Sequence, residues 1–289
     1  MCSIRFSEGS PLMRNALKYE VQLCLTALMF YTRIPVSAKL PFSQNRLNRS
    51  RKYFPAIGII VGSIAVLFYS ICVSYTGSTL AVLISMCATV LATGAFHEDG
   101  FADSCDGLGG GWEKDTVLKI MKDSRIGTYG TIGLLFILTI KAASLVELAR
   151  ITQFELFIFL YICAHTWSRQ CASCAIDFFN YVQDIEQSKV KPITDHKLST
   201  SDQCISLATC FAVIIIVILI NAHLIIAIMG CIIIAYLFLK YSEKRIGGYT
   251  GDILGATQQL TEVSFYIISL FVISANSIPS SSTANTILL

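Results

Sequence analysis

Long runs of apolar residues recur along the 289 residues of this chain and constrain its fold more than any other feature. An α-helix needs about 20 mostly apolar residues to cross a lipid bilayer. The runs of this kind are residues 54–73, 79–96, 126–149, 154–176, 204–239 and 253–274. The run 204–239 is too long for one helix, and Asn221, Ala222 and His223 near its middle predict a tight turn between two antiparallel helices. The pattern therefore predicts about seven transmembrane helices.

Composition supports an all-α, polytopic integral membrane bundle. Hydrophobic residues make up 54% of the chain and charged residues 14%, whereas soluble domains contain about 25% charged residues. A shorter apolar run, residues 17–31, is interrupted by Lys18, Glu20 and Gln22. It predicts an N-terminal interfacial or re-entrant helix that ends before Pro35. We expect one membrane-embedded domain over residues 1–276 and a flexible C-terminal tail over residues 277–289. The net charge of +3 is too small to indicate a nucleic-acid partner.

Basic residues are distributed unevenly between the predicted helices. If the helices alternate in direction, the connections 39–52, 97–125, 177–203 and 240–252 lie on one side and carry fifteen Lys and Arg residues. The connections on the opposite side carry one, Arg150. An excess of Lys and Arg marks the cytoplasmic side of a membrane, so we expect the long polar loops to face the cytoplasm.

The first long loop carries an acidic motif. If the preceding helix continues to Gly107, then Asp99, Asp103 and Asp106 lie on one stripe of that helix. Oxygen ligands without His or Cys partners suit Mg²⁺ or Mn²⁺. The alternative is a solvated acidic face at the end of a helix. Like charges at a helix C-terminus oppose the helix dipole, which favours a metal site.

Two further polar segments could complete a site on the same side. Lys119, Lys122 and Arg125 either clamp a phosphate or anchor the chain at the membrane surface. The glycine-rich loop 247–256 contributes Asp252, which shares a helix face with Gln259 and Glu262. A charged residue within the membrane usually belongs to a functional site, so we expect a functional role for Glu262.

Three other charged or titratable residues fall within the apolar runs. A lone histidine such as His165 more often packs in the interior than takes part in function. The sequence supports a structural and a functional role for Arg169 equally. We expect Lys141 to extend its amine to the membrane surface.

These groups indicate metal-assisted transfer on a diphosphate, but they do not separate phosphoryl transfer from prenyl transfer. The sequence lacks a Walker A motif, a GxSxG motif, and a GxGxxG motif between a strand and a helix. A transporter would place its carboxylates at the membrane midplane, whereas most of these lie at one edge.

At these segments the chain resembles the adenosylcobinamide-GDP ribazoletransferase family, also called the cobalamin-5′-phosphate synthases. The matching segments are residues 30–36, 53–58, 97–107, 120–130 and 247–256. The start of the acidic motif also resembles the CDP-alcohol phosphotransferase pattern, but the later Asp spacing departs from it. Residues 177–246 match no motif, and their role is left open.

The resemblance implies a phosphotransferase for substituted phosphate groups. It would join adenosylcobinamide-GDP to alpha-ribazole or alpha-ribazole 5′-phosphate, release GMP and use Mg²⁺ in the bacterial inner membrane. The alternative is another intramembrane diphosphate transferase, either CDP-alcohol phosphotransferase-like or a prenyltransferase. The oligomeric state, the number of metal ions, the general base and the lower-ligand base are left open.

On this interpretation the metal ligands are Asp99, Asp103 and Asp106. The catalytic candidates are Glu98, Asp103, Asp106, Lys122, Arg125 and Asp252. The substrate-binding candidates are Arg33, His97, Lys119, Ser124, Tyr129, Arg169, Thr250, Gln259 and Glu262.

Overall fold

The computed structural model describes residues 11–36, 39–182 and 197–277, and this part of the chain is helical. Its helices are α1 (Pro11–Tyr31), α2 (Gln44–Ser50), α3 (Phe54–Thr93), α4 (Phe96–Gly110), α5 (Lys114–Met121), α6 (Thr128–Ile151), α7 (Phe154–Phe178), α8 (Thr200–Ile220), α9 (Ile225–Ile246) and α10 (Gly251–Ser277), with short 3-10 turns at Arg51–Tyr53 and Ala222–Leu224. A β-bridge joins Tyr181 to Tyr249. The predicted tail 277–289 lies outside the described residues, except for Ser277.

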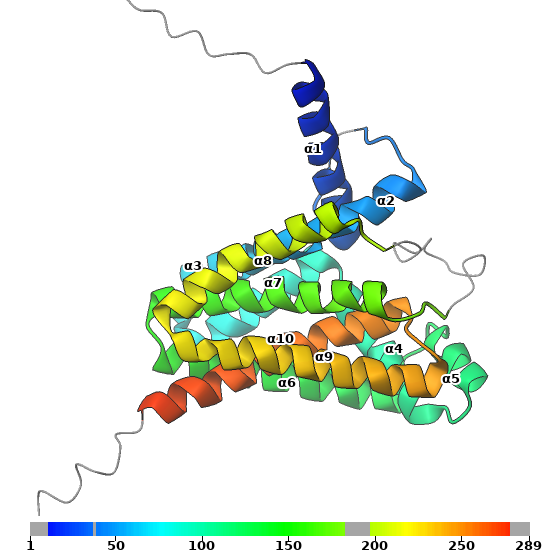
Figure 1. The fold of residues 1–289 in the computed structure, drawn as a ribbon. Helices are drawn as coiled ribbons and strands as arrows, with labels where there is room; N and C mark the ends of the chain where they lie inside the picture. Colours follow the sequence, from blue (N-terminus) through cyan, green and yellow to red (C-terminus); the bar gives the residue numbers. More distant parts are fainter. Residues whose placement is uncertain (1–10, 37–38, 183–196, 278–289) are drawn as a thin grey trace, which may run out of the picture.

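The long helices form one bundle. Helices α3 and α6 to α10 run along a common direction, as Figure 1 shows. Within the described residues, five helical segments are long and apolar enough to cross a membrane: Gln44–Thr93, Thr128–Ile151, Thr200–Ile220, Ala222–Ile246 and Gly251–Asn276. Helix α7 is not among them, although most of its side chains are buried in the bundle. The all-α membrane bundle is confirmed, and the number of crossings stays a prediction.

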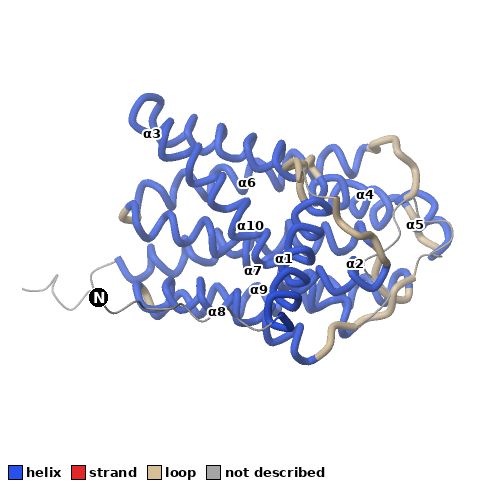
Figure 2. The backbone as a smooth tube through the Cα atoms, turned by 90° about the horizontal axis from the view of Figure 1, so that it is seen from above, coloured by secondary structure: helices blue, strands red, loops and turns tan. Residues whose placement is uncertain are grey.

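Helix α3 contains two of the predicted crossings, because the chain reverses at Gly77. Gly77 has a φ of 74°, which interrupts the helix with a conformation that favours glycine. The two ends of α3 meet the same segment: the Phe54 ring stacks on Tyr31 at 4.0 Å, and the Arg33 amide donates to Ala92 O at 2.7 Å. Figure 2 shows the tube of α3 turning back at the far end of the bundle.

The expectation that the second crossing continues as one helix to Gly107 was wrong. Gly94 and Ala95 both have left-handed backbones, with φ values of 68° and 57°. They end α3 and turn the chain, so α4 begins afresh at Phe96 with its own direction. The acidic motif is therefore carried by a separate helix rather than by the end of a membrane-spanning one.

The predicted turn between the two helices of run 204–239 is confirmed. Asn221 ends α8, and its side chain accepts the amide of His223 at 3.1 Å. With this turn, the described parts of the polar connections lie at one end of the bundle, where α4 and α5 lie (Figure 1). The connections between α6 and α7 and between α8 and α9 lie at the opposite end (Figure 1).

Helix α1 crosses the direction of the bundle helices rather than following it, as Figure 1 shows. It is not among the segments that could span a membrane. Ion pairs hold the segment after it to the bundle: Lys52 contacts both Glu20 of α1 and Asp202 of α8 at 2.7 Å. This placement agrees with an interfacial helix.

Candidate functional site

Two glycines let the acidic helix α4 lie close to the start of α10. A Cβ atom on Gly100 would meet the Cα of Asp252 at 3.0 Å, and one on Gly255 would meet the backbone O of His97 at 3.2 Å. Thr250 caps α10, since its Oγ1 accepts the amide of Ile253 at 3.3 Å. The structure therefore brings together the acidic motif and the glycine-rich loop, which lie far apart in the sequence.

Three carboxylates near this junction act on one another electrostatically, and we refer to Asp99, Asp103 and Asp252 as the acidic cluster. Asp99 is exposed, whereas Asp103 and Asp252 are half-buried. Burial is the largest cause that raises the pKa of Asp103 to about 7, and the negative charges of Asp252, Asp99 and Asp106 contribute to the same rise in that order. Among the described residues, no basic group is a cause of the shift, so negative charge gathers around Asp103.

Asp106 serves a different partner. Its carboxylate accepts the backbone amides of Gly127 at 2.7 Å and Gly130 at 2.8 Å, which form the first turn of α6. The carboxylate therefore satisfies free amides and complements the positive end of the helix dipole. Each oxygen keeps a second lone pair that is able to contact a metal, so the predicted metal contact of Asp106 stays a prediction.

The acidic cluster fits Mg²⁺ by its chemistry. Within residues 11–36, 39–182 and 197–277, no group of three or more His, Cys, Asp or Glu side chains is close enough to form a complete metal cage. Mg²⁺ does not need one, because it commonly takes one or two carboxylates together with substrate phosphates. Asp103, with Asp99 or Asp252, would hold the ion, and a divalent cation would relieve the repulsion that raises the pKa of Asp103.

The predicted basic residues lie on the exposed segment between α4 and α6. Lys119, Lys122 and Arg125 are exposed, and Arg125 pairs with Asp123 at 2.7 Å. In the described part of the chain none of the three forms an ion pair with the acidic cluster. They are free to reach a phosphate in solvent, but the structure does not assemble them into a clamp.

The remaining candidates of the polar end are also accessible. Ser124 and Tyr129 are exposed, and the ring of Tyr129 lies against Gly109, near the end of α4. Arg33 is exposed and lies over Gly94, beside the start of α4. Tyr129 and Arg33 therefore lie beside opposite ends of α4.

A second set of charges lies deeper in the bundle. Glu262 is 1% exposed and forms ion pairs with Lys141 of α6 and with His165 Nδ1 of α7 at 3.2 Å. The expectation that Lys141 extends to the membrane surface was wrong, since the residue is 2% exposed. A buried carboxylate is stable only when it is paired, and Glu262 provides a nearer partner than the surface.

Between these two regions, polar groups of α4, α7 and α10 meet in the interior. Gln259 donates to Glu98 Oε1 at 3.0 Å, and Arg169 donates to the backbone O of His165 at 2.8 Å. His97 stacks on Phe54 with ring centroids 5.8 Å apart. Burial and the charge of Arg169 lower the pKa of His97 well below its usual range, so the ring is neutral. The predicted residues Glu98, His97, Arg169 and Gln259 are therefore brought together.

Sequence reasoning missed two residues that support the site. Arg245, at the end of α9, donates to the backbone oxygens of Leu108 and Gly111 and so fixes the C-terminal end of α4. Gln258 links Glu262 to Ser168 of α7, with 2.9 Å between its Nε2 and Ser168 Oγ. Neither belongs to an acidic or glycine-rich motif, although a basic residue in the last turn of a helix is a general signal for such a contact.

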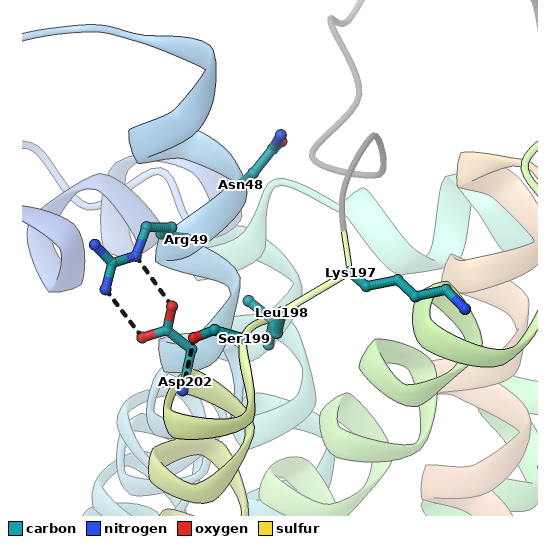
Figure 3. Close-up of a pocket in the computed structure, with 6 residues that line it drawn as sticks. All are labelled: Asn48, Arg49, Lys197, Leu198, Ser199 and Asp202. Carbon is teal, nitrogen blue, oxygen red and sulfur yellow. Dashed lines mark hydrogen bonds and ion pairs between the residues drawn. The ribbon is translucent and has the colours of Figure 1, made fainter.

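A surface pocket of about 410 Å³ lies beside the N-terminus of α8. It is lined by Asn48, Arg49, Lys197, Leu198, Ser199 and Asp202 (Figure 3). Asp202 accepts hydrogen bonds from Arg49 Nε at 3.0 Å and from Arg49 Nη2 at 3.2 Å, so these two charges neutralise each other, while Lys197 adds a further positive charge to the lining. None of the predicted site residues lines this pocket.

Comparison with known proteins adds an independent finding. Residues 23–270 match the model of the family described as cobalamin-5-phosphate synthase. An adenosylcobinamide-GDP ribazoletransferase of Vibrio cholerae is 39% identical over 260 residues, which cover 89% of this chain and 97% of the relative. Proteins with the same description from Shewanella woodyi and Shewanella piezotolerans are 40% and 38% identical, over 89% and 88% of this chain and 98% and 97% of their own lengths. No matching solved structure is found.

Proposed function

Because the chain belongs to the cobalamin-5-phosphate synthase family, we propose that it joins adenosylcobinamide-GDP to alpha-ribazole, or to its 5′-phosphate, and releases GMP. The product is adenosylcobalamin or its 5′-phosphate, formed late in cobalamin biosynthesis. One observation carries this proposal at the level of residues. The matched segment includes both halves of the acidic cluster, which α4 and α10 bring together at the polar end of the bundle.

The chemistry follows from the substrates. An acceptor that carries a 5′-phosphate has no free 5′-hydroxyl, so a secondary hydroxyl of its ribose attacks the phosphorus bonded to cobinamide. A new P–O bond forms, the bond to the GMP phosphate breaks, and its electron pair leaves with GMP. Mg²⁺, when bound, would neutralise charge on the diphosphate. Positioning and charge stabilisation supply most of the catalysis in reactions of this class.

The residues of this chain divide the work by their location. The acidic cluster faces the polar end and would hold the cation-bound diphosphate. Lys122 and Arg125 lie on a solvent-exposed segment at the same end and would contact the phosphates from outside, with Arg125 suited to two parallel hydrogen bonds.

The structure favours one of the candidate bases. Both oxygens of Asp106 accept amides of α6, and Asp252 belongs to the acidic cluster. Glu98 is not part of the acidic cluster: its Oε1 accepts a hydrogen bond from Gln259 Nε2, and its Oε2 has no hydrogen-bond partner within the described residues. Glu98 Oε2 is therefore the atom to which we assign the proton of the attacking hydroxyl.

The polar end would face the cytoplasm of a bacterial cell from the inner membrane. The uneven distribution of Lys and Arg supports this orientation. Single cysteines introduced at Trp112 and at Tyr75, which are 91% and 89% exposed and lie at opposite ends of the bundle, test it in a variant without native cysteines. We expect a membrane-impermeant thiol reagent to label intact spheroplasts at position 75 and only lysed membranes at position 112.

A substrate comparison tests the activity itself. Purified protein in detergent or liposomes receives Mg²⁺ and alpha-ribazole together with adenosylcobinamide-GDP, a prenyl diphosphate or a CDP-alcohol. We expect GMP release and a cobalamin product with the first donor alone. Turnover of a prenyl diphosphate or CDP-alcohol, with none of GDP-activated corrinoid, would overturn the proposal in favour of the other intramembrane transferases.

A further inference from the structure

Four buried side chains near the acidic cluster each keep one polar atom without a hydrogen-bond partner among the described residues. The atoms are His97 Nε2, Glu98 Oε2, Arg169 Nε and Gln259 Oε1. Their residues are 3%, 8%, 1% and 2% exposed. Buried polar groups are nearly always paired, so such atoms call for an occupant that hydrogen-bonds to them. We refer to these four residues as the unpaired cluster.

The four side chains belong to one locality. Gln259 and Glu98 are hydrogen-bonded to each other at 3.0 Å. The Phe54 ring lies 5.8 Å from the ring of His97 and 5.8 Å from the guanidinium carbon of Arg169. The charge of Arg169 also acts on His97. Helices α4, α7 and α10 therefore place these groups in the interior, near the ring of Phe54.

The chemistry of the free atoms selects the occupant. Glu98 Oε2 and Gln259 Oε1 accept hydrogen bonds, Arg169 Nε donates one, and the second ring nitrogen of a histidine such as His97 is able to do either. The carboxylate of Glu98 would repel a phosphate, and the guanidinium of Arg169 would repel a cation. A hydroxyl both donates and accepts, so a neutral group with neighbouring hydroxyls satisfies all four atoms.

We propose that the unpaired cluster binds the secondary hydroxyls of the ribose of the nucleoside acceptor. This inference rests on the proposed function, because it assigns the acceptor to the inner side of the acidic cluster. It places the donor diphosphate at the polar end and the attacking hydroxyl one helical layer deeper. Glu98 then lies at the boundary between the two substrates.

The test combines a change in the ligand with a change in the protein. Dissociation constants of alpha-ribazole and of its 2′,3′-dideoxy analogue are measured by calorimetry for the wild-type protein, Gln259→Leu and Arg169→Met. For the wild type we expect the analogue to bind at least about tenfold more weakly, since it loses hydrogen bonds to charged groups. In each variant we expect this ratio to fall to about threefold or less, because the partner of the missing hydroxyl is already gone.

A matched control uses another unpaired polar atom. Tyr266 of α10 is fully buried, and its hydroxyl also lacks a partner among the described residues. Tyr266→Phe should keep the tenfold ratio. Gln259→Asn, which retains both an amide donor and an acceptor oxygen, should keep more of the ratio than Gln259→Leu, so a variant that folds poorly does not leave the question unanswered.

The outcomes separate this inference from the proposed function. If the wild type releases GMP but both variants keep the wild-type ratio of the two dissociation constants, the unpaired cluster holds water or has a structural role. That result overturns the inference and leaves the proposed function intact. If the wild type neither binds alpha-ribazole nor releases GMP, the proposed function itself fails. An unchanged ratio in Tyr266→Phe together with a collapsed ratio in Gln259→Leu supports the inference.

Discussion

The carboxylate of Asp106 and the backbone amide of Gly127 are 2.7 Å apart, although 21 positions separate them in the sequence. This hydrogen bond joins the last part of the acidic helix α4 to the first turn of α6. The bond gives the Asp106 carboxylate a backbone partner in addition to the metal that its position in the stripe predicts. It also gives one carboxylate of the motif a structural task that the other two do not have.

Asp106→Asn should destabilise the protein. Asparagine keeps one acceptor oxygen but places an amide group against the second backbone N–H, and it removes the charge at the N-terminus of α6. We expect a loss of about 1–2 kcal/mol, measured as a lower midpoint of denaturant unfolding in detergent. Asp115→Asn, an exposed acidic residue at the same end, is the control and should leave the midpoint unchanged. Equal midpoints for the two variants would show that the α6 cap contributes nothing.

Lys141→Met should be strongly destabilising, because it leaves Glu262 buried without its lysine partner. Breaking a buried ion pair on one side costs about 3–5 kcal/mol. The double variant Lys141→Met with Glu262→Gln should recover part of that loss, since the uncompensated charge is gone. Thermal unfolding of both variants measures the effect. A single variant as stable as the wild type would mean that the lysine extends to solvent after all.

Arg125→Met should weaken use of the GDP-activated donor without affecting the fold. Arg125 is 86% exposed in its side chain, and its ion pair with Asp123 is a surface contact that contributes little stability. We expect the KM for the donor to rise about tenfold or more, because one charge-assisted contact to phosphate is lost. Arg150→Met is a matched control at the opposite end of the bundle, where Arg150 also forms an exposed pair, with Glu147. A donor KM that stays at the wild-type value would remove Arg125 from the site.

The sequence predicts structural features that local patterns determine, but not those that contacts between distant segments determine. The helices followed from apolar runs, and the turn at Asn221 followed from a short polar interruption. The break at Gly94 and Ala95 could not be predicted, because alanine rarely adopts the left-handed backbone that Ala95 has here.

The site shows the same division. Helical spacing placed Asp99 and Asp103 on one face, but it could not show that Gly127 and Gly130 would bind Asp106. The depth of Lys141 was misjudged for a related reason, since its partner Glu262 lies on another helix. Contacts between distant segments decide both cases, and periodicity within one segment carries no information about them.

The pKa of Asp103 predicts how stability depends on pH in the absence of divalent ions. Burial and neighbouring carboxylates raise this pKa from 3.8 to about 7. The folded state therefore binds more protons than the unfolded state between these values, and stability should fall as pH rises through that window. Asp103→Asn should flatten this part of the profile, and Mg²⁺ should protect the wild type more at pH 8 than at pH 5. A wild-type melting temperature that rises from pH 5 to pH 7 in EDTA, to the same extent as that of the variant, would contradict the assigned charge cluster.

The release of GMP by Asp103→Asn tests the central claim most directly, namely that the acidic cluster carries the transfer. The variant is purified in detergent and assayed beside the wild type and Asp115→Asn with Mg²⁺, adenosylcobinamide-GDP and alpha-ribazole. We expect Asp103→Asn to unfold at or above the wild-type temperature while its turnover falls at least about a hundredfold, as is typical when a major electrostatic contribution to the transition state is removed. Wild-type turnover in a folded Asp103→Asn protein would contradict the account.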